Sequence, residues 1–365
     1  MKRLASLKTS NIKVSSFIEE YLFPQKLYLE ISNKADLKIK SKKVYKGQLL
    51  YIDNNNSYYS PVSGDIIGIN NNYLEIENDF KEEDNYKGID DFTTKTLKLS
   101  FKDKIHNANF DFNKIDKYQN IIVSGIEDQP YIVNNILLLE KYTSEILEML
   151  DLIYNEYHKD IIIVVKDNET TLINKISSLI GSYPYIKVEI VPNLYPIGNK
   201  NILSKYLNIK DFYYFSSEDL YYLYEDIVKD RRRSTTFVTI SGNALDKNAL
   251  VNIKIGTPLN EVINALFNIK EEKYKIIKNG LLNGEYVNEQ LIIDQSIRAI
   301  YIMKDINIVE KKCILCGKCN NVCPFKCNPY LSLISKGKYR SKKCINCGLC
   351  TYICPSNIKL GGYVK

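Results

Sequence analysis

The sequence of 365 residues contains no tryptophan and only two histidines, His106 and His158. Imidazole metal sites and histidine proton relays therefore have almost no raw material in this chain. No apolar run approaches the roughly 18 residues that a membrane-spanning helix needs, and the first residues lack the apolar segment of a signal peptide. These absences predict a cytoplasmic protein, or one that lies peripherally on the cytoplasmic face of a membrane and reaches it only through partners.

Cysteine is also missing from the first 312 residues, and all nine cysteines lie between Cys313 and Cys354. In the cytoplasm such a dense group is typical of metal binding rather than of disulfides. The net charge of +7 is unevenly distributed, because residues 311–365 carry eleven basic side chains and no acidic one. The rest of the chain contains 39 basic and 43 acidic residues. A basic surface at the cysteine-rich end would attract an acidic redox partner.

The pattern of apolar residues divides the chain into five regions. Short alternating runs with turn residues predict β structure first, and a polar connector follows. Strands that alternate with helices then predict a mostly parallel α/β domain, and a mixed pattern predicts a small α+β domain before the cysteine module. The predicted boundaries are 1–80, 81–118, 119–232, 233–308 and 309–365.

Several local signals predict where single elements lie. Apolar spacing predicts a helix from about 131 to 156 and a buried strand at 161–165. Ser216 with Asp219 has the pattern of a capping box that opens a further helix. A helix is also expected to start at Pro258.

Two cysteine motifs repeat the same spacing, C-x2-C-x2-C-x3-C-P. Short C-x2-C steps let three thiolates converge on one [4Fe-4S] cluster, whereas the fourth cysteine lies too far around to reach it, so ligation crosses between the motifs. The first cluster is assigned to Cys313, Cys316, Cys319 and Cys354. The second cluster is assigned to Cys344, Cys347, Cys350 and Cys323.

Two alternatives concern the same module. Zinc also takes four cysteines, but zinc ribbons use two C-x2-C pairs, so the pattern favours iron-sulfur clusters. The basic residues leave nucleic-acid binding as a competing hypothesis, although no helix-turn-helix or finger pattern accompanies them.

Cys327 is the ninth cysteine, and we interpret it as a packed free thiol because both clusters are complete without it. Between the motifs, Asn328 as N-cap and Pro329 at the first helical position predict a short helix that ends near Gly337.

Further short stretches at residues 46–48, 60–64, 125–131, 195–200 and 256–258 occur in this order before the cysteine motifs. Together they resemble the C subunit of the Rnf electron-transport complex, whose middle domain is similar to the flavin-bearing subunit of respiratory complex I. The resemblance implies a multidomain α/β plus α+β protein. Its parts would be an N-terminal β barrel-sandwich, a Rossmann-like α/β domain, an SLBB or β-grasp domain and a helical ferredoxin domain with two [4Fe-4S] clusters.

In that family a Gly-Gly-Ala-Gly-Phe-Pro-Thr loop binds flavin mononucleotide (FMN) and faces NADH. The counterpart here, residues 88–94, keeps Gly88 and Phe92. Such loops work because absent side chains let backbone N–H groups approach phosphate. Ile89 blocks this approach, and the two aspartates that follow it would repel a phosphate. The connector over 81–118 therefore carries a degenerate flavin loop.

The resemblance also assigns Glu127 and Lys200 to this FMN and NADH site. Gln129 replaces the second acidic residue of the family's Glu-x-Glu pair, and no Gly-x-Gly sequence supplies another dinucleotide fingerprint. We therefore expect an α/β scaffold that has lost the flavin and NADH site.

The resemblance implies an electron-transfer component of an oxidoreductase rather than a self-sufficient enzyme. It would relay single electrons between a reduced carrier (NADH, a flavoprotein or ferredoxin) and a partner reductase or an Rnf-type membrane complex. The sequence is also similar to the branch that accompanies D-proline reductase in anaerobic metabolism. The alternatives are an active FMN-containing NADH dehydrogenase subunit, and a structural or nucleic-acid-binding iron-sulfur protein.

Overall fold

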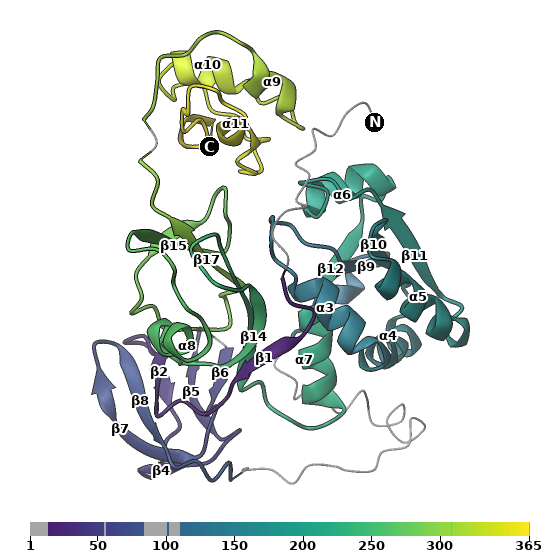
Figure 1. Cartoon of the computed structure of the whole chain (residues 1–365). Helices are drawn as coiled ribbons and strands as arrows, with labels where there is room; N and C mark the ends of the chain where they lie inside the picture. The colour runs from purple at the N-terminus through teal and green to yellow at the C-terminus, as the bar shows by residue number, and fades with distance from the viewer. Residues whose placement is uncertain (1–13, 55, 84–100, 102–109, 308, 365) are drawn as a thin grey trace.

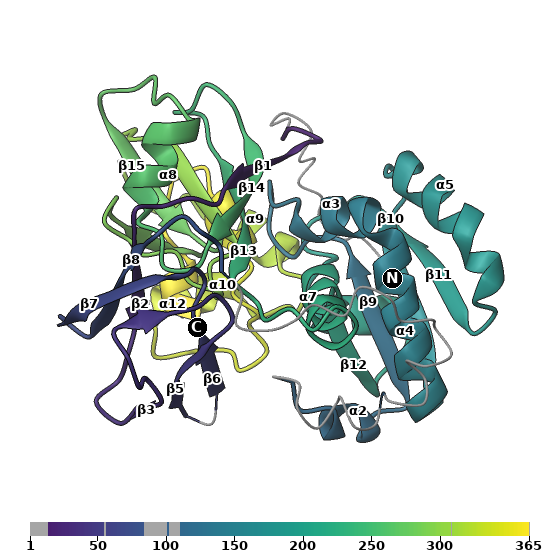
Figure 2. The ribbon, with the colours of Figure 1, turned by 90° about the horizontal axis from the view of Figure 1, so that it is seen from below.

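The computed structural model describes residues 14–54, 56–83, 101, 110–307 and 309–364. An N-terminal sandwich and a six-stranded sheet lie side by side, an α/β domain lies across from them, and a helical module ends the chain (Figures 1 and 2). Within these residues no helix has the length and apolar character that crossing a membrane requires.

The N-terminal sandwich consists of two antiparallel sheets around one core. The strands of the first sheet are β2 (Lys26–Glu30), β8 (Tyr73–Asn78), β7 (Gly64–Asn70) and β4 (Lys43–Val44). Those of the second are β3 (Asp36–Leu37), β5 (Leu49–Asp53) and β6 (Asn56–Tyr59). Leu27, Leu50 and Ile76 from both sheets are fully buried between them.

The six-stranded sheet is covered by α8 (Leu259–Leu266), which packs Leu259, Val262 and Ile263 onto it. Its strands, in spatial order, are β1 (Ile18–Tyr21), β14 (Ala249–Lys254), β13 (Thr235–Ser241), β17 (Ala299–Lys304), β15 (Tyr274–Lys278) and β16 (Glu285–Val287). The strand β1 pairs with β14, in parallel, and not with the N-terminal sandwich. The region predicted over 1–80 therefore contributes its first strand to another sheet, which strand periodicity alone does not reveal.

The α/β domain is built on a four-stranded sheet in which every neighbouring pair is parallel. The spatial order is β11 (Ile186–Val191), β10 (Asp160–Lys166), β9 (Asn120–Gly125) and β12 (Phe212–Ser216). The buried strand predicted at 161–165 lies within β10, whereas β12 was not predicted. From β9 the chain adds β10 and then β11 on one side of the sheet, and it later adds β12 on the other side of β9. The strand order therefore reverses between β9 and β12.

Helices cover one face of this sheet, and they pack on side chains such as Ile121 and Val123. They are α3 (Asn134–Lys141), α4 (Thr143–Tyr157), α5 (Thr170–Leu179) and α7 (Ser217–Ile227), while the short α2 (Asn113–Asp116) and the 3-10 turn Ile180–Ser182 lie in the connections. The helix predicted over 131–156 is thus two helices, separated at Tyr142.

In the described part of the chain, one helix, α6 (Lys200–Leu207), covers the opposite face of the sheet, which carries Ile122 and Val164. Phe325 and Ile345 of the C-terminal module pack against the same cluster. A parallel sheet needs both faces covered. The module therefore completes the second face of the α/β domain.

Across residues 309–364 the C-terminal module contains four short helices. They are α9 (Lys318–Val322), α10 (Pro329–Ile334), α11 (Leu349–Tyr352) and α12 (Gly361–Val364). The side chain of Asn328 accepts a hydrogen bond from the amide of Leu331 at 3.2 Å, and Pro329 is the first residue of α10. The predicted short helix between the motifs is confirmed.

Candidate iron-sulfur centres

The two cysteine motifs form matching backbone turns. In each, the glycine after the second cysteine is left-handed, with φ of +70° at Gly317 and +75° at Gly348. Each glycine precedes a short helix that carries the third cysteine, Cys319 or Cys350. Gly348 also lies against Leu282, whose Cβ would be 2.5 Å from a Cβ at position 348. The turn and the domain contact both require glycine there.

Thiols from both motifs line one cavity in the module. Cys323 comes from the first motif and Cys344, Cys347 and Cys350 come from the second. Burial, together with the neighbouring cysteine sulfurs, raises the pKa of Cys347 to about 11 and that of Cys350 to about 12. Thiols gathered away from water resist ionisation. Iron removes this cost because it binds the thiolate form.

This donor set fits a [4Fe-4S] cluster, because thiolates are the ligands that such clusters use. Among the described residues that line the cavity, none is a histidine or a carboxylate. No group of three or more histidine, cysteine or acidic side chains in the described part of the chain is placed to hold a single metal ion. A [4Fe-4S] cluster does not need that convergence, since each thiolate binds a different iron. When bound, the cluster supplies reversible one-electron transfer.

Cys327 lines the same cavity and is 2% exposed. Its backbone N–H donates a hydrogen bond to the Sγ atom of Cys323 at 3.2 Å. Burial raises the pKa of the Cys327 thiol to about 11. The residue interpreted as a packed free thiol is therefore buried, and its amide contacts one of the predicted ligands.

The cysteines assigned to the first cluster lie in a more open environment. Cys313 and Cys316 are exposed, whereas every cysteine assigned to the second cluster is partly buried. Burial raises the pKa of Cys319, and the sulfurs of Cys316 and Cys354 raise it further. The last cysteine of the second motif thus lies beside the first motif.

Side chains from other domains donate hydrogen bonds to the backbone of the second motif. The hydroxyl of Tyr195, in the α/β domain, donates to the carbonyl oxygen of Cys347 at 2.6 Å. The side chain of Asn283, from the loop after β15, donates to the carbonyl oxygen of Asn346 at 2.7 Å. The Tyr195 ring packs with Leu349 of the module. Two other domains therefore hold the second motif in place.

In open α/β sheets, ligands bind beyond the carboxyl ends of the strands where the strand order reverses. At this point, between β9 and β12, polar side chains are paired with one another. The Ser217 hydroxyl donates to the carbonyl of Ser124 at 2.7 Å, and the Ser217 amide donates to the Asn135 side chain at 3.1 Å. The Tyr214 hydroxyl donates to Ser124 Oγ at 2.7 Å. These groups satisfy each other without a ligand.

Glu127 follows β9, and its side chain is 1% exposed. Arg298, which precedes β17, pairs with Glu127 at 3.1 Å and with Asp128 at 3.1 Å. Burial raises the pKa of Glu127 to about 7, although Arg298 acts in the opposite direction. The structure thus places Glu127 in an ion-pair network that joins the α/β domain to the six-stranded sheet.

The other residues assigned to the flavin and NADH site do not join the ion-pair network of Glu127 in the described part of the chain. Lys200 is the exposed first residue of α6. Its loop lies next to that of Glu127, because a Cβ on Gly198 would be 2.1 Å from the Glu127 carbonyl oxygen. Gly88 and Phe92 lie outside the described residues. The Glu127 side chain faces Arg298, while the Lys200 side chain is exposed.

Two family models match parts of this chain. One, described as a 4Fe-4S dicluster domain, matches residues 305–355. The other, described as the Nuo51 FMN-binding domain, matches residues 94–213. A solved NAD⁺-reducing [NiFe]-hydrogenase is similar over 70% of this chain and 52% of its own, with 11% identity and a TM-score of 0.48.

Curated relatives are named as the C subunit of an ion-translocating oxidoreductase complex. One from Buchnera aphidicola of Acyrthosiphon pisum is 26% identical over 59% of this chain and 49% of its own length. Another, from Buchnera aphidicola of Baizongia pistaciae, is 24% identical over 84% of this chain and 70% of its own. A third, from Haemophilus influenzae, is 23% identical over 58% of this chain, which spans 35% of that relative.

The dicluster module, joined to an α/β domain of the flavoprotein type, defines an iron-sulfur electron-transfer protein with two [4Fe-4S] clusters. Its curated homologues are the C subunits of ion-translocating oxidoreductase (Rnf) complexes. The chain spans about half the length of the first of these relatives.

Sequence reasoning missed the roles of Arg298 and Tyr195. A signal for Arg298 existed, because only six of the 50 basic residues are arginine and Arg298 stands alone between Arg233 and Arg340. An isolated arginine in a lysine-rich chain fits a buried pair, since its planar fork suits two carboxylates. Tyr195 lies in the stretch 195–200 that carries the resemblance, but nothing in the sequence links its hydroxyl to the cysteine module.

Proposed function

We propose that this protein is a one-electron relay between a reduced carrier and a partner reductase or an Rnf-type membrane complex. The crossed ligand sets predicted above are part of the proposal. Its main support is the cavity that Cys323 shares with Cys344, Cys347 and Cys350, because it joins the two motifs into one electron-transfer unit. The setting is the cytoplasm or the cytoplasmic face of a membrane.

The proposal includes the loss of the family's FMN and NADH site. Support comes from the reversal point of the parallel sheet, where Ser124, Ser217 and Tyr214 are paired with one another. Arg298 also forms ion pairs with the carboxylates of Glu127 and Asp128, which would otherwise be available to a ligand. Glu127 and the polar groups at the reversal point are thus engaged in contacts within the protein.

The proposal also includes the domains predicted from the sequence. In the six-stranded sheet, the helix α8 follows β14 in the chain, and the spatial order of strands includes β14, β13, β17, β15 and β16. This arrangement supports an SLBB or β-grasp assignment. The two packed sheets of the N-terminal region support the barrel-sandwich assignment.

The test measures iron, sulfide, zinc and flavin in one anaerobic preparation. We expect about eight iron and eight sulfide per chain, no flavin, and electron paramagnetic resonance (EPR) signals of reduced clusters after dithionite. Two zinc ions without sulfide would contradict the relay. Clusters that resist dithionite, together with salt-sensitive DNA or RNA binding, would support the structural alternative.

A second candidate is an active FMN-containing NADH dehydrogenase subunit. It is favoured by the match of residues 94–213 to the FMN-binding family model. Reconstitution with FMN, followed by NADH-dependent bleaching of the clusters, would support it. Absence of both flavin retention and bleaching would leave the relay without its own NADH site.

A further inference from the structure

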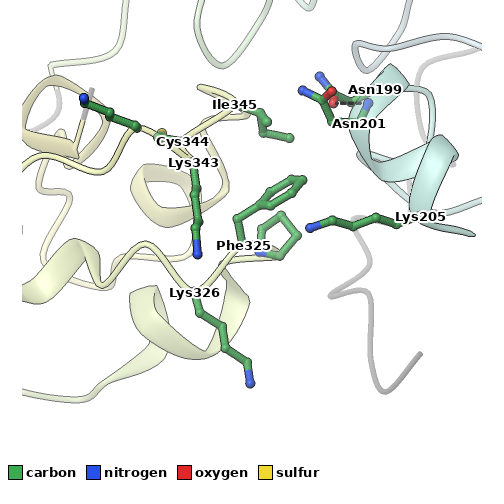
Figure 3. Close-up of a pocket in the computed structure, with 10 residues that line it drawn as sticks. Asn199, Asn201, Lys205, Phe325, Lys326, Lys343, Cys344 and Ile345 are labelled. Atoms are coloured by element: carbon green, nitrogen blue, oxygen red, sulfur yellow. Dashed lines mark hydrogen bonds between the residues drawn. The ribbon is translucent and has the colours of Figure 1, made fainter. Parts of the chain in front are cut away.

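A groove with a volume of about 620 Å³ lies between α6 and the C-terminal module. Lys205, Asn199 and Asn201 line it from the α/β side, and Lys326, Lys342 and Lys343 line it from the module. Among the described residues that line it, none is acidic. Figure 3 shows Lys205 reaching across toward Phe325, with Lys326 and Lys343 extending from the module.

The groove adjoins the cavity of the second thiol group. Cys344 and Ile345 line both spaces, as do Pro324 and Phe325. The wall between them is therefore a single layer of residues that includes one of the predicted ligands. A redox centre held in the groove would lie close to the second cluster.

Contacts between the domains hold both walls in place. The Lys205 ammonium lies 3.8 Å from the centre of the Phe325 ring, which is a cation–π contact. Phe325 and Ile345 also pack against the core of the α/β domain. The groove is therefore formed before any partner binds, which lowers the cost of docking.

We propose that this groove docks an acidic redox protein, whose carboxylates contact Lys326, Lys342 and Lys343. The inference rests on the relay function proposed above and adds the docking surface and the chemistry of the partner. Charge complementarity supports it, because the described lining combines exposed lysines with no carboxylate, and such a surface attracts and orients a carboxylate-rich one. With the second cluster bound, one electron would pass between it and the partner's centre, so that one would be oxidised as the other is reduced.

The test compares two triple variants with the same loss of charge. The groove variant is K326Q/K342Q/K343Q, and the control variant is K318Q/K336Q/K338Q, whose lysines are exposed in the same module but do not line the groove. The probe is a fluorescent decaglutamate peptide, and binding to cluster-loaded protein is followed by anisotropy at low and high salt. We expect about tenfold weaker binding to the groove variant and less than twofold change in the control.

A second measurement follows electron transfer. Dithionite-reduced protein is reoxidised by ferricyanide, an anion, or by hexaamminecobalt(III), a cation. The groove variant should react several-fold more slowly with ferricyanide but not with the cobalt complex, and decaglutamate should slow ferricyanide only in proteins with an intact groove. Iron content of each variant shows that the clusters are still present.

Equal binding and equal rates in the two triple variants would overturn the groove proposal while leaving the relay intact. Displacement of decaglutamate by an equal or lower concentration of inorganic pyrophosphate would also overturn it, in favour of a phosphate-bearing small ligand. Failure of the relay itself would instead appear as missing iron and sulfide, or as clusters that dithionite does not reduce.

Discussion

Two groups of thiols with the same sequence spacing have different surroundings in this protein. The first group includes the exposed Cys313 and Cys316, beside Ile314 and Leu315, which are 64% and 70% exposed. The second group is partly buried and lies against two other domains. Potentials of iron-sulfur clusters depend on hydrogen bonds and solvent exposure. A repeated motif therefore does not imply two equivalent clusters.

The crossed ligation predicts the largest effect. Because the Cys327 thiol lines the same cavity, the experiment starts from Cys327→Ala, which should keep about eight iron atoms per chain. Adding Cys323→Ala should remove about four of them, since it removes a ligand of the second cluster. Iron and sulfide analysis of anaerobically purified protein measures the loss.

The identity of the remaining cluster decides whether ligation crosses. The EPR spectrum after Cys323→Ala should match that of a Cys344→Ala variant and differ from that of Cys313→Ala. A match to Cys313→Ala would mean that each motif holds its own cluster. The two ligand sets compared above, each with cysteines from both motifs, would then be wrong.

Loss of the Arg298 guanidinium should weaken the frame that holds the second group. Arg298→Gln leaves Glu127 buried without its cation, and because Arg298 is one-third exposed we expect about 2 kcal/mol lower free energy of unfolding. Anaerobic urea unfolding followed by circular dichroism measures it. The control is Arg231→Gln, which removes the ion pair between the exposed Arg231 and Glu225 and should cost less than about 1 kcal/mol.

Features of the fold that depend on residues close together in the sequence, such as helix starts, could be predicted from the sequence. The capping box of Ser216 and Asp219 is confirmed, with the Asp219 amide donating to Ser216 Oγ at 3.0 Å. The helix expected at Pro258 is confirmed as α8, with Pro258 as its N-cap. Such devices involve neighbours within a few residues, so periodicity and residue type suffice.

Non-local parts could not be predicted in the same way. The strand β1 pairs with β14, some 230 residues later, and nothing in its four residues names that partner. The strand β12 has no clear sequence signal, because Tyr213 and Tyr214 interrupt the usual aliphatic pattern of a buried strand. The burial of the second thiol group likewise depends on Tyr195 and Asn283, which are distant in sequence.

Exposure predicts that the two clusters differ in their reaction with oxygen. In air, the visible absorbance of the wild-type protein should bleach in two phases, of which the faster belongs to the open first group. A Cys354→Ala variant, which keeps the second cluster, should bleach several-fold more slowly than Cys323→Ala/Cys327→Ala, which keeps the first. Equal rates would show that the surrounding domains do not protect the second cluster.

The smallest effect is expected from the hydrogen bond between the Tyr195 hydroxyl and the Cys347 carbonyl. Tyr195→Phe removes one buried donor and should lower the free energy of unfolding by about 1 kcal/mol. Because Cys347 is a predicted ligand, the midpoint potential of the second cluster should shift while that of the first stays constant. The control is Tyr339→Phe, at an exposed position of the same module, which should change neither quantity. A destabilised protein with two unchanged potentials would mean that Tyr195 joins the domains without influencing the cluster beside it.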